Sequence, residues 1–123
     1  MHALVVDDSK TIRLLLREQL KTLGFEVTEA GDGHQALNRL KKMSHVDLVL
    51  VDWNMPEMDG ISFVRAVRAE SVYATLPMMM VTTNAELAQV SKALEAGANE
   101  YIMKPFTADI LREKLELLGF LQG

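Results

Sequence analysis

The sequence contains no cysteine, and this absence excludes several kinds of chemistry. A chain without thiols has no disulfide framework, no thiolate metal ligand and no cysteine nucleophile. Basic residues are also in deficit, with 13 Lys and Arg against 17 Asp and Glu and a net charge of −4. That balance argues against a nucleic-acid-binding surface, which needs a basic patch.

Long apolar runs are missing as well. No run approaches the roughly 20 residues of a membrane-spanning helix. The N-terminus, MHALVVDDSK, lacks the basic start and the long apolar stretch of a signal peptide. We therefore expect a cytoplasmic protein. Its 123 residues are enough for one hydrophobic core and too few for two, so we expect a single domain over residues 1–123 without an output domain.

Short apolar runs alternate along the chain with amphipathic stretches. The predicted strands are 3–7, 25–30, 46–52, 77–83 and 100–104. The predicted helices are 10–23, 34–43, 61–70, 85–96 and 107–118. Their apolar faces are expected to include Leu15, Leu94 and Ile110. Gly24 and Gly97 are expected to end the first and fourth helices, and Thr107 to cap the fifth.

The order of elements predicts an α/β fold, a five-stranded parallel sheet doubly wound as (βα)5. Near-continuous apolar strands are typical of parallel sheets covered on both faces. Only FEVTEA (25–30) alternates, as expected of an edge strand. Right-handed crossovers and short connections then favour an open, doubly wound sheet.

Polar residues stand at four of the predicted strand ends. The first strand ends in Asp7 and Asp8, the third in Asp52, the fourth in Thr82 and the fifth in Lys104. Each has an ordinary explanation alone, such as a turn, a β-former or a solvated lysine. In an open parallel sheet, however, ligands bind at the carboxyl ends of the strands. All four ends share that edge, which favours a functional site.

The three carboxylates at this edge would repel one another in a partly desolvated cleft, so they need a cation. Oxygen ligands without His or Cys favour Mg²⁺ or a similar divalent ion. A carboxylate nucleophile, a metal, the Lys104 ammonium and the Thr82 hydroxyl together suit phosphoryl transfer onto Asp.

The segments LVVDDS, DWNMPEMDG, PMMMVTT and YIMKPF resemble the receiver domain of bacterial two-component response regulators. The resemblance covers nearly the whole chain and is strongest, through DWNMP and KPFTA, to single-domain members that act in chemotaxis. It implies a flavodoxin-like strand order of 2-1-3-4-5. It also implies a signalling phospho-acceptor, not an enzyme acting on other substrates, that promotes only its own phosphorylation and dephosphorylation.

The resemblance assigns roles to individual residues. Asp52 would accept the phosphoryl group and, with Asp8, bind Mg²⁺ through its side chain. The backbone carbonyl of Asn54 would complete the protein ligands, and Asp7 would act mainly through water. Lys104 would contact the phosphoryl group.

Thr82 and Tyr101 would form the switch, the hydroxyl moving towards the phosphate and the tyrosine turning inward. The output surface would comprise the fourth helix, fifth strand and fifth helix. The family also has a cis Lys104–Pro105 bond. Two departures from the family pattern are Thr83, where a smaller residue is usual, and Asn84, where the chemotaxis members carry an acid.

The implied partners are a sensor histidine kinase as phosphodonor, a flagellar motor switch protein as target, and in some systems a phosphatase. The alternative within the family is a phosphorelay intermediate that passes phosphate to a histidine phosphotransfer protein. An Asp-nucleophile phosphatase would need an acid where Asn54 stands. An EF-hand loop counted from Asp52 fails at Pro56 and Glu57, and no Walker motif is present.

Overall fold

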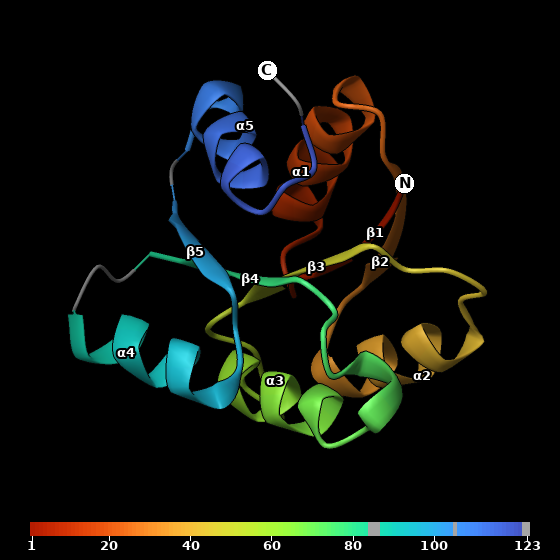
Figure 1. Cartoon of the computed structure of the whole chain (residues 1–123), viewed down its shortest axis with the longest axis vertical. Helices are drawn as coiled ribbons and strands as arrows, with labels where there is room; N and C mark the ends of the chain where they lie inside the picture. Colours follow the sequence, from red (N-terminus) through yellow and green to blue (C-terminus); the bar gives the residue numbers. More distant parts are fainter. Residues whose placement is uncertain (84–86, 105, 122–123) are drawn as a thin grey trace.

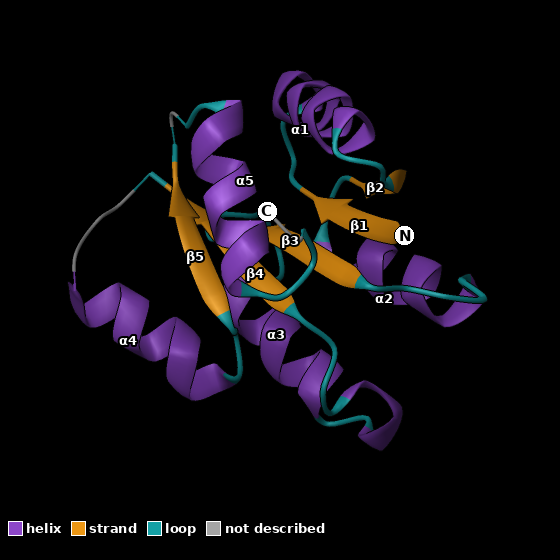
Figure 2. Ribbon diagram, turned by 45° about the horizontal axis from the view of Figure 1, so that its top comes forward, coloured by secondary structure: helices purple, strands orange, loops and turns teal. Residues whose placement is uncertain are grey.

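The computed structural model describes residues 1–83, 87–104 and 106–121. Within these residues, five parallel strands form one sheet in the order β2-β1-β3-β4-β5 (Figure 2). The strands are β1 (His2–Val6), β2 (Glu26–Ala30), β3 (Leu48–Asp52), β4 (Met78–Thr82) and β5 (Glu100–Met103). The predicted α/β fold and its strand order are therefore confirmed, and β2 is an edge strand as its alternation predicted.

Helices cover both faces of the sheet, which makes a three-layer molecule (Figure 1). Helices α1 (Lys10–Thr22) and α5 (Ala108–Leu117) lie on one face. Helices α2 (Gly33–Lys42), α3 (Gly60–Arg68) and α4 (Leu87–Ala96) lie on the other. A 3₁₀ turn, η1 (Ser71–Tyr73), follows α3 and was not predicted from the sequence. No helix among the described residues is long and apolar enough to cross a membrane.

The sheet separates two hydrophobic clusters because successive side chains of a strand point to opposite faces. Leu4, Val49 and Met80 belong to the cluster under α2 and α3. Val5, Leu50 and Ile102 belong to the cluster under α1 and α5. Strands β3 and β4 are buried along their whole length, which explains their uninterrupted apolar sequence.

The helix ends follow from local sequence. Ser9, Asp32, Asp59 and Thr107 each accept a hydrogen bond from a backbone amide in the first turn of the helix that follows. Gly24 has a φ of 96°, a left-handed conformation that favours glycine and stops α1 as predicted.

Three apolar side chains predicted to be buried are instead exposed. Leu15 is 46%, Leu94 47% and Ile110 41% exposed. The helices bury narrower stripes than predicted: Leu16 and Leu20 in α1, and Leu111 and Leu115 in α5. The two residues of each pair are four positions apart and face the sheet together. The side chain next to a buried one, as at Leu15 and Ile110, is turned away from the sheet. The expectations for residues 84–86, the Leu87 side chain and the Lys104–Pro105 bond fall outside the described residues.

Arg68, the last residue of α3, joins three segments at the end of the sheet opposite the predicted site. Its Nε and Nη2 donate to the carbonyl of Gly97, just after α4, at 3.0 and 2.8 Å. Its Nη1 donates to the carbonyl of Tyr73 at 2.7 Å. Its Nη2 also donates to Asn99 Oδ1 at 2.8 Å, and that atom accepts from the Met78 amide. Burial lowers the pKa of Arg68.

Candidate functional site

The strand register brings the predicted polar residues to one edge of the sheet. Asp52 ends β3 and lies beside Val81, one residue before Thr82. Thr82 ends β4 and pairs with Met103, one residue before Lys104. The Lys104 amide donates to the Thr82 carbonyl at 2.7 Å, which fixes the end of β5 against the end of β4. The strand ends predicted from the sequence therefore meet in the structure.

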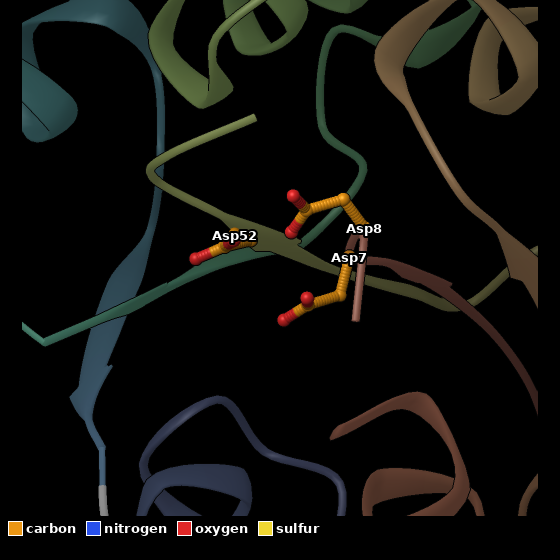
Figure 3. Close-up of side chains that lie close together, drawn as sticks. All are labelled: Asp7, Asp8 and Asp52. Carbon is orange, nitrogen blue, oxygen red and sulfur yellow. The ribbon is translucent and has the colours of Figure 1, made fainter. Parts of the chain in front are cut away.

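Three carboxylates gather at this edge (Figure 3). Asp7, Asp8 and Asp52 each offer an oxygen atom, and these atoms lie within 4.8 Å of one another. Asp7 is 1% and Asp52 7% exposed, whereas Asp8 is exposed to solvent. The cluster thus has a buried side formed by two carboxylates and an open side at Asp8.

Lys104 binds both buried carboxylates. Its ammonium Nζ is 3.0 Å from Asp7 Oδ2 and 3.4 Å from Asp52 Oδ1. The lysine side chain is only 16% exposed, so these ion pairs are shielded from water. One cation therefore faces three anionic groups, and the cluster keeps an excess of negative charge.

Burial and the neighbouring charges both affect the protonation of Asp52. Burial, reinforced by the charge of Asp7 and opposed by Lys104, raises the pKa of Asp52 to about 6. Burial alone would lower the pKa of Lys104, but hydrogen bonds and attraction to Asp7 and Asp52 outweigh it, so the pKa is raised. The lysine is thus charged at neutral pH, whereas the pKa of the Asp52 carboxylate is close to neutral pH.

The loop after Asp52 passes very close to the strand it leaves. A Cβ at Gly60 would collide with the carbonyl oxygen of Asp52 and lie 2.7 Å from Met80 Cε. The Gly60 amide donates to the Trp53 carbonyl at 3.1 Å, and the Trp53 amide donates to Val81 at 3.0 Å. Glycine at position 60 therefore allows α3 to begin directly beside Asp52. Asn54 is exposed within this loop.

Thr82 and Thr83 differ sharply in exposure. Thr82 is 2% exposed at the end of β4, whereas Thr83 is exposed. Thr83 lines a surface hollow with Lys104, Leu15, Ile12 and Phe106. This hollow explains why Leu15 is not covered, and it places the apolar side of α1 next to the lysine of the site.

Tyr101 occupies the edge strand β5 and is half-buried. The Lys114 ammonium of α5 lies 4.5 Å from the centre of its ring, a cation–π contact. Glu100 Oε1 accepts from Lys114 at 3.1 Å and from the Tyr101 amide at 3.0 Å. The sequence predicted Tyr101 as a switch residue but did not predict its contact with Lys114, because β5 and α5 are separate elements.

Sequence reasoning also missed the residues that hold the Asp7–Asp8 segment. The Ser9 amide donates to Asp7 Oδ1 at 2.8 Å, and Arg13 Nη1 donates to the Asp7 carbonyl at 2.7 Å. The Asp7 amide donates to the Ala30 carbonyl at 3.1 Å. Serine before a helix is a recognisable sequence signal of an N-cap, but the sequence does not show that the Arg13 side chain binds the Asp7 carbonyl.

The donor set fits a divalent cation. Carboxylate oxygens are the hard ligands that Mg²⁺ and Ca²⁺ prefer. Burial and the charges of Asp7 and Asp8 raise the pKa of Asp52 in spite of the contact with Lys104. A dication held by the three acids would supply positive charge, and the exposed Asp8 side leaves the cluster accessible.

Comparison with known proteins identifies the class. The sequence profile of the response regulator receiver domain matches residues 3–116, and the chain belongs to this family. Among its relatives, the chain is 49% identical to a chemotaxis protein CheY homolog of Campylobacter jejuni, covering 94% of this chain and 90% of the relative. It is 44% identical to chemotaxis protein CheY1 of Helicobacter pylori, covering 96% of each.

Comparison with solved structures gives the same family. The chemotaxis protein CheY4 of Vibrio cholerae superposes with a TM-score of 0.89 at 36% identity, covering 94% of this chain and 96% of that one. The chain is thus a CheY-like receiver domain, a signalling protein. The predicted resemblance to this family is confirmed.

Proposed function

We propose that this chain accepts a phosphoryl group on Asp52 from a phosphohistidine donor and thereby changes its affinity for a protein target. The observation that carries the proposal is the contact of one ammonium group with two buried carboxylates. Lys104 Nζ lies 3.0 Å from Asp7 and 3.4 Å from Asp52, beside a third acid. This arrangement concentrates charge where a phosphoryl group would be received.

The transfer is a displacement at phosphorus. An Asp52 carboxylate oxygen forms the new O–P bond while the P–N bond to the donor imidazole breaks. The imidazole leaves with the electron pair of that bond and takes a proton from solvent. Lys104 can then move its interaction from the Asp52 oxygen to the phosphoryl oxygens, where negative charge has increased.

Mg²⁺ fits the proposal as the cofactor, with the Asp8 and Asp52 side chains and the Asn54 carbonyl as its protein ligands and Asp7 acting mainly through water. When bound, it offsets the charge of the transferring phosphoryl group. Asp7 and Lys104 remain paired on the buried side of the cluster. Exposed Asp8 lies on the side from which the ion and the donor would approach.

The proposed switch uses Thr82 and Tyr101. Phosphorylation adds a charge of about −1.5 to −2 and strong acceptor oxygens next to Thr82. A hydroxyl that turns to donate to these oxygens vacates space into which Tyr101 can move. Tyr101 belongs to β5, the edge strand that lies between α4 and α5 (Figure 1), so a change in its position would alter the α4–β5–α5 surface. A target that prefers one position is then bound or released.

The partners belong to the same proposal. A sensor histidine kinase supplies the phosphoryl group, and a flagellar motor switch protein receives the signal, in keeping with the chemotaxis proteins among the relatives. The cytoplasmic location expected from the sequence also remains part of the proposal.

Trp53 provides the test of Asp52. It is the only tryptophan, and it follows Asp52 directly. Mg²⁺ should change its fluorescence, and a small phosphodonor such as acetyl phosphate should change it further. Asp52→Asn should abolish the second change and the mass increase of one phosphoryl group. Asp59→Asn, which alters a helix cap in the same loop, is the control and should keep both responses. A phosphorylated Asp52→Asn protein would overturn the assignment.

The role of the target is tested by binding. Phosphorylation should increase the affinity for a motor switch protein severalfold in a pull-down or titration. Equal binding with and without phosphodonor, combined with phosphate transfer to a histidine phosphotransfer protein, would replace the motility role with that of a phosphorelay intermediate.

A further inference from the structure

Arg13 of α1 contacts the acidic segment from outside the predicted site. Its Nη1 donates to the Asp7 carbonyl at 2.7 Å. Its Nε donates to Glu29 Oε1 of β2 at 3.2 Å. The two side chains of this ion pair are only 18% and 23% exposed. One guanidinium group therefore joins α1, the end of β1 and β2.

The hydrogen bond to the Asp7 carbonyl oxygen restricts the backbone next to Asp8. This oxygen belongs to the planar peptide unit that also contains the amide nitrogen and Cα of Asp8. A hydrogen bond that fixes the direction of this oxygen therefore fixes the plane from which Asp8 leaves the chain. The Asp7 amide and the Ser9 amide are fixed separately, by Ala30 and by Asp7 Oδ1.

Asp8 depends on its backbone for its position. Its side chain is exposed, and across residues 1–83, 87–104 and 106–121 its carboxylate has no hydrogen-bond partner. Asp7, by contrast, is buried and paired with Lys104. The orientation of the Asp7–Asp8 peptide thus determines where the third carboxylate of the cluster lies.

We propose that Arg13, held by Glu29, is a positioning residue that presets the Asp7–Asp8 peptide for metal binding. The inference rests on the proposed function in that it takes Mg²⁺ as the ligand of the acidic cluster. Arg13 does not touch the ion. It raises the affinity by fixing the peptide from which Asp8 extends before the ion binds, so that less conformational entropy is lost on binding.

Arg17 supplies a matched control. It lies one turn further along α1, and its Nη1 binds the other oxygen of the same glutamate, Glu29 Oε2, at 3.1 Å. Its side chain is 41% exposed, and among the described residues its hydrogen bonds do not include Asp7. Removing Arg17 deletes the same charge from the same helix without releasing the peptide.

The experiment measures Mg²⁺ affinity by calorimetry and Trp53 fluorescence. Arg13→Ala should weaken binding about tenfold, whereas Arg17→Ala should remain within about twofold of wild type. Arg13→Lys, which keeps one donor, should fall between them. At saturating Mg²⁺ all three should accept phosphate at near wild-type rates. In the metal-free proteins, the NMR amide shifts of Asp8 and Ser9 should move in Arg13→Ala and stay in Arg17→Ala.

Each outcome has a defined meaning. Equal Mg²⁺ affinity for Arg13→Ala and Arg17→Ala would overturn the positioning role alone. Absence of saturable Mg²⁺ binding to the wild-type protein would overturn the proposed function as well. If Arg13→Ala does not fold, Arg13→Lys decides, because affinity equal to that of Arg17→Ala in that variant also overturns the role.

Discussion

At the scale of single residues, the environment of Asp52 favours its protonated form. The pKa of about 6 lies above the ordinary value of 3.8, so the folded protein binds this proton more tightly than the unfolded chain does. The ionised carboxylate at neutral pH therefore reduces stability by roughly 3 kcal/mol relative to an unperturbed aspartate. Keeping Asp52 ionised within the acidic cluster thus opposes folding.

The first prediction concerns this proton. Without metal, lowering the pH from 7.5 to 5 should let Asp52 protonate in the folded state and add about 1 kcal/mol to the free energy of unfolding. Urea unfolding with EDTA at a series of pH values measures it. Asp52→Asn should lack this gain, and the three histidines common to both proteins cancel in the comparison. Parallel pH profiles for the two proteins would contradict the raised pKa.

The second prediction concerns Lys104. Lys104→Ala leaves Asp7 and Asp52 buried without their shared cation, and should lower the metal-free free energy of unfolding by about 3 kcal/mol. Mg²⁺ should recover part of this loss, because it supplies positive charge to the same oxygens. Lys114→Ala, which removes the partner of Glu100, should cost less than about 1 kcal/mol. Similar losses for the two variants would show that Lys104 does not balance the cluster.

At the scale of elements, the start of α3 depends on the missing side chain of Gly60. Gly60→Ala would place a methyl group against the Asp52 carbonyl and Met80 Cε. We predict a loss of about 2 kcal/mol in unfolding free energy, together with weaker Mg²⁺ binding. Gly31→Ala is the control, since its Cβ would meet Arg13 and Gln35 at an ordinary 3.6 Å. An unchanged stability for Gly60→Ala would mean that α3 can move away from β3 freely.

The elements themselves were largely predictable, because strands buried on both faces of a parallel sheet, such as β3 and β4, have uninterrupted apolar sequences. The strand ends also indicated the site, since carboxyl ends of parallel strands share an edge. The exposures of Leu15 and Ile110 were not predictable, because the sequence of an amphipathic helix does not show how wide a stripe of its apolar face the sheet covers. The contacts of Arg13 and Arg68 could not be predicted from the sequence either, since their long side chains bind residues on other elements.

At the scale of the whole molecule, binding of a metal to the acidic cluster would be coupled to folding. A ligand that binds only the folded state at 100 times its Kd adds about 2.7 kcal/mol to stability. We predict that Mg²⁺ raises the midpoint of thermal unfolding and that Asp8→Asn largely removes the increase. Because Asp8 is exposed, the metal-free variant should stay within about 0.5 kcal/mol of wild type.

Glu113→Gln is the control for this prediction, since it removes one exposed negative charge from α5. It should keep the full stabilisation by Mg²⁺. If Asp8→Asn retained the same increase as Glu113→Gln, the exposed acid would not be a metal ligand.

The bonds of Arg68 to Gly97, Tyr73 and Asn99 have a mechanical consequence for α4. They attach the segment that directly follows α4 to α3 and η1, so we expect any displacement of α4 to be a rotation about its C-terminal end. A helix of ten residues is about 15 Å long, and a tilt of roughly 10° moves its opposite end by about 2 to 3 Å. That opposite end follows Thr82 in the chain. A tilt of α4 about the end held by Arg68 would therefore mainly displace the helix end next to the acidic edge of the sheet.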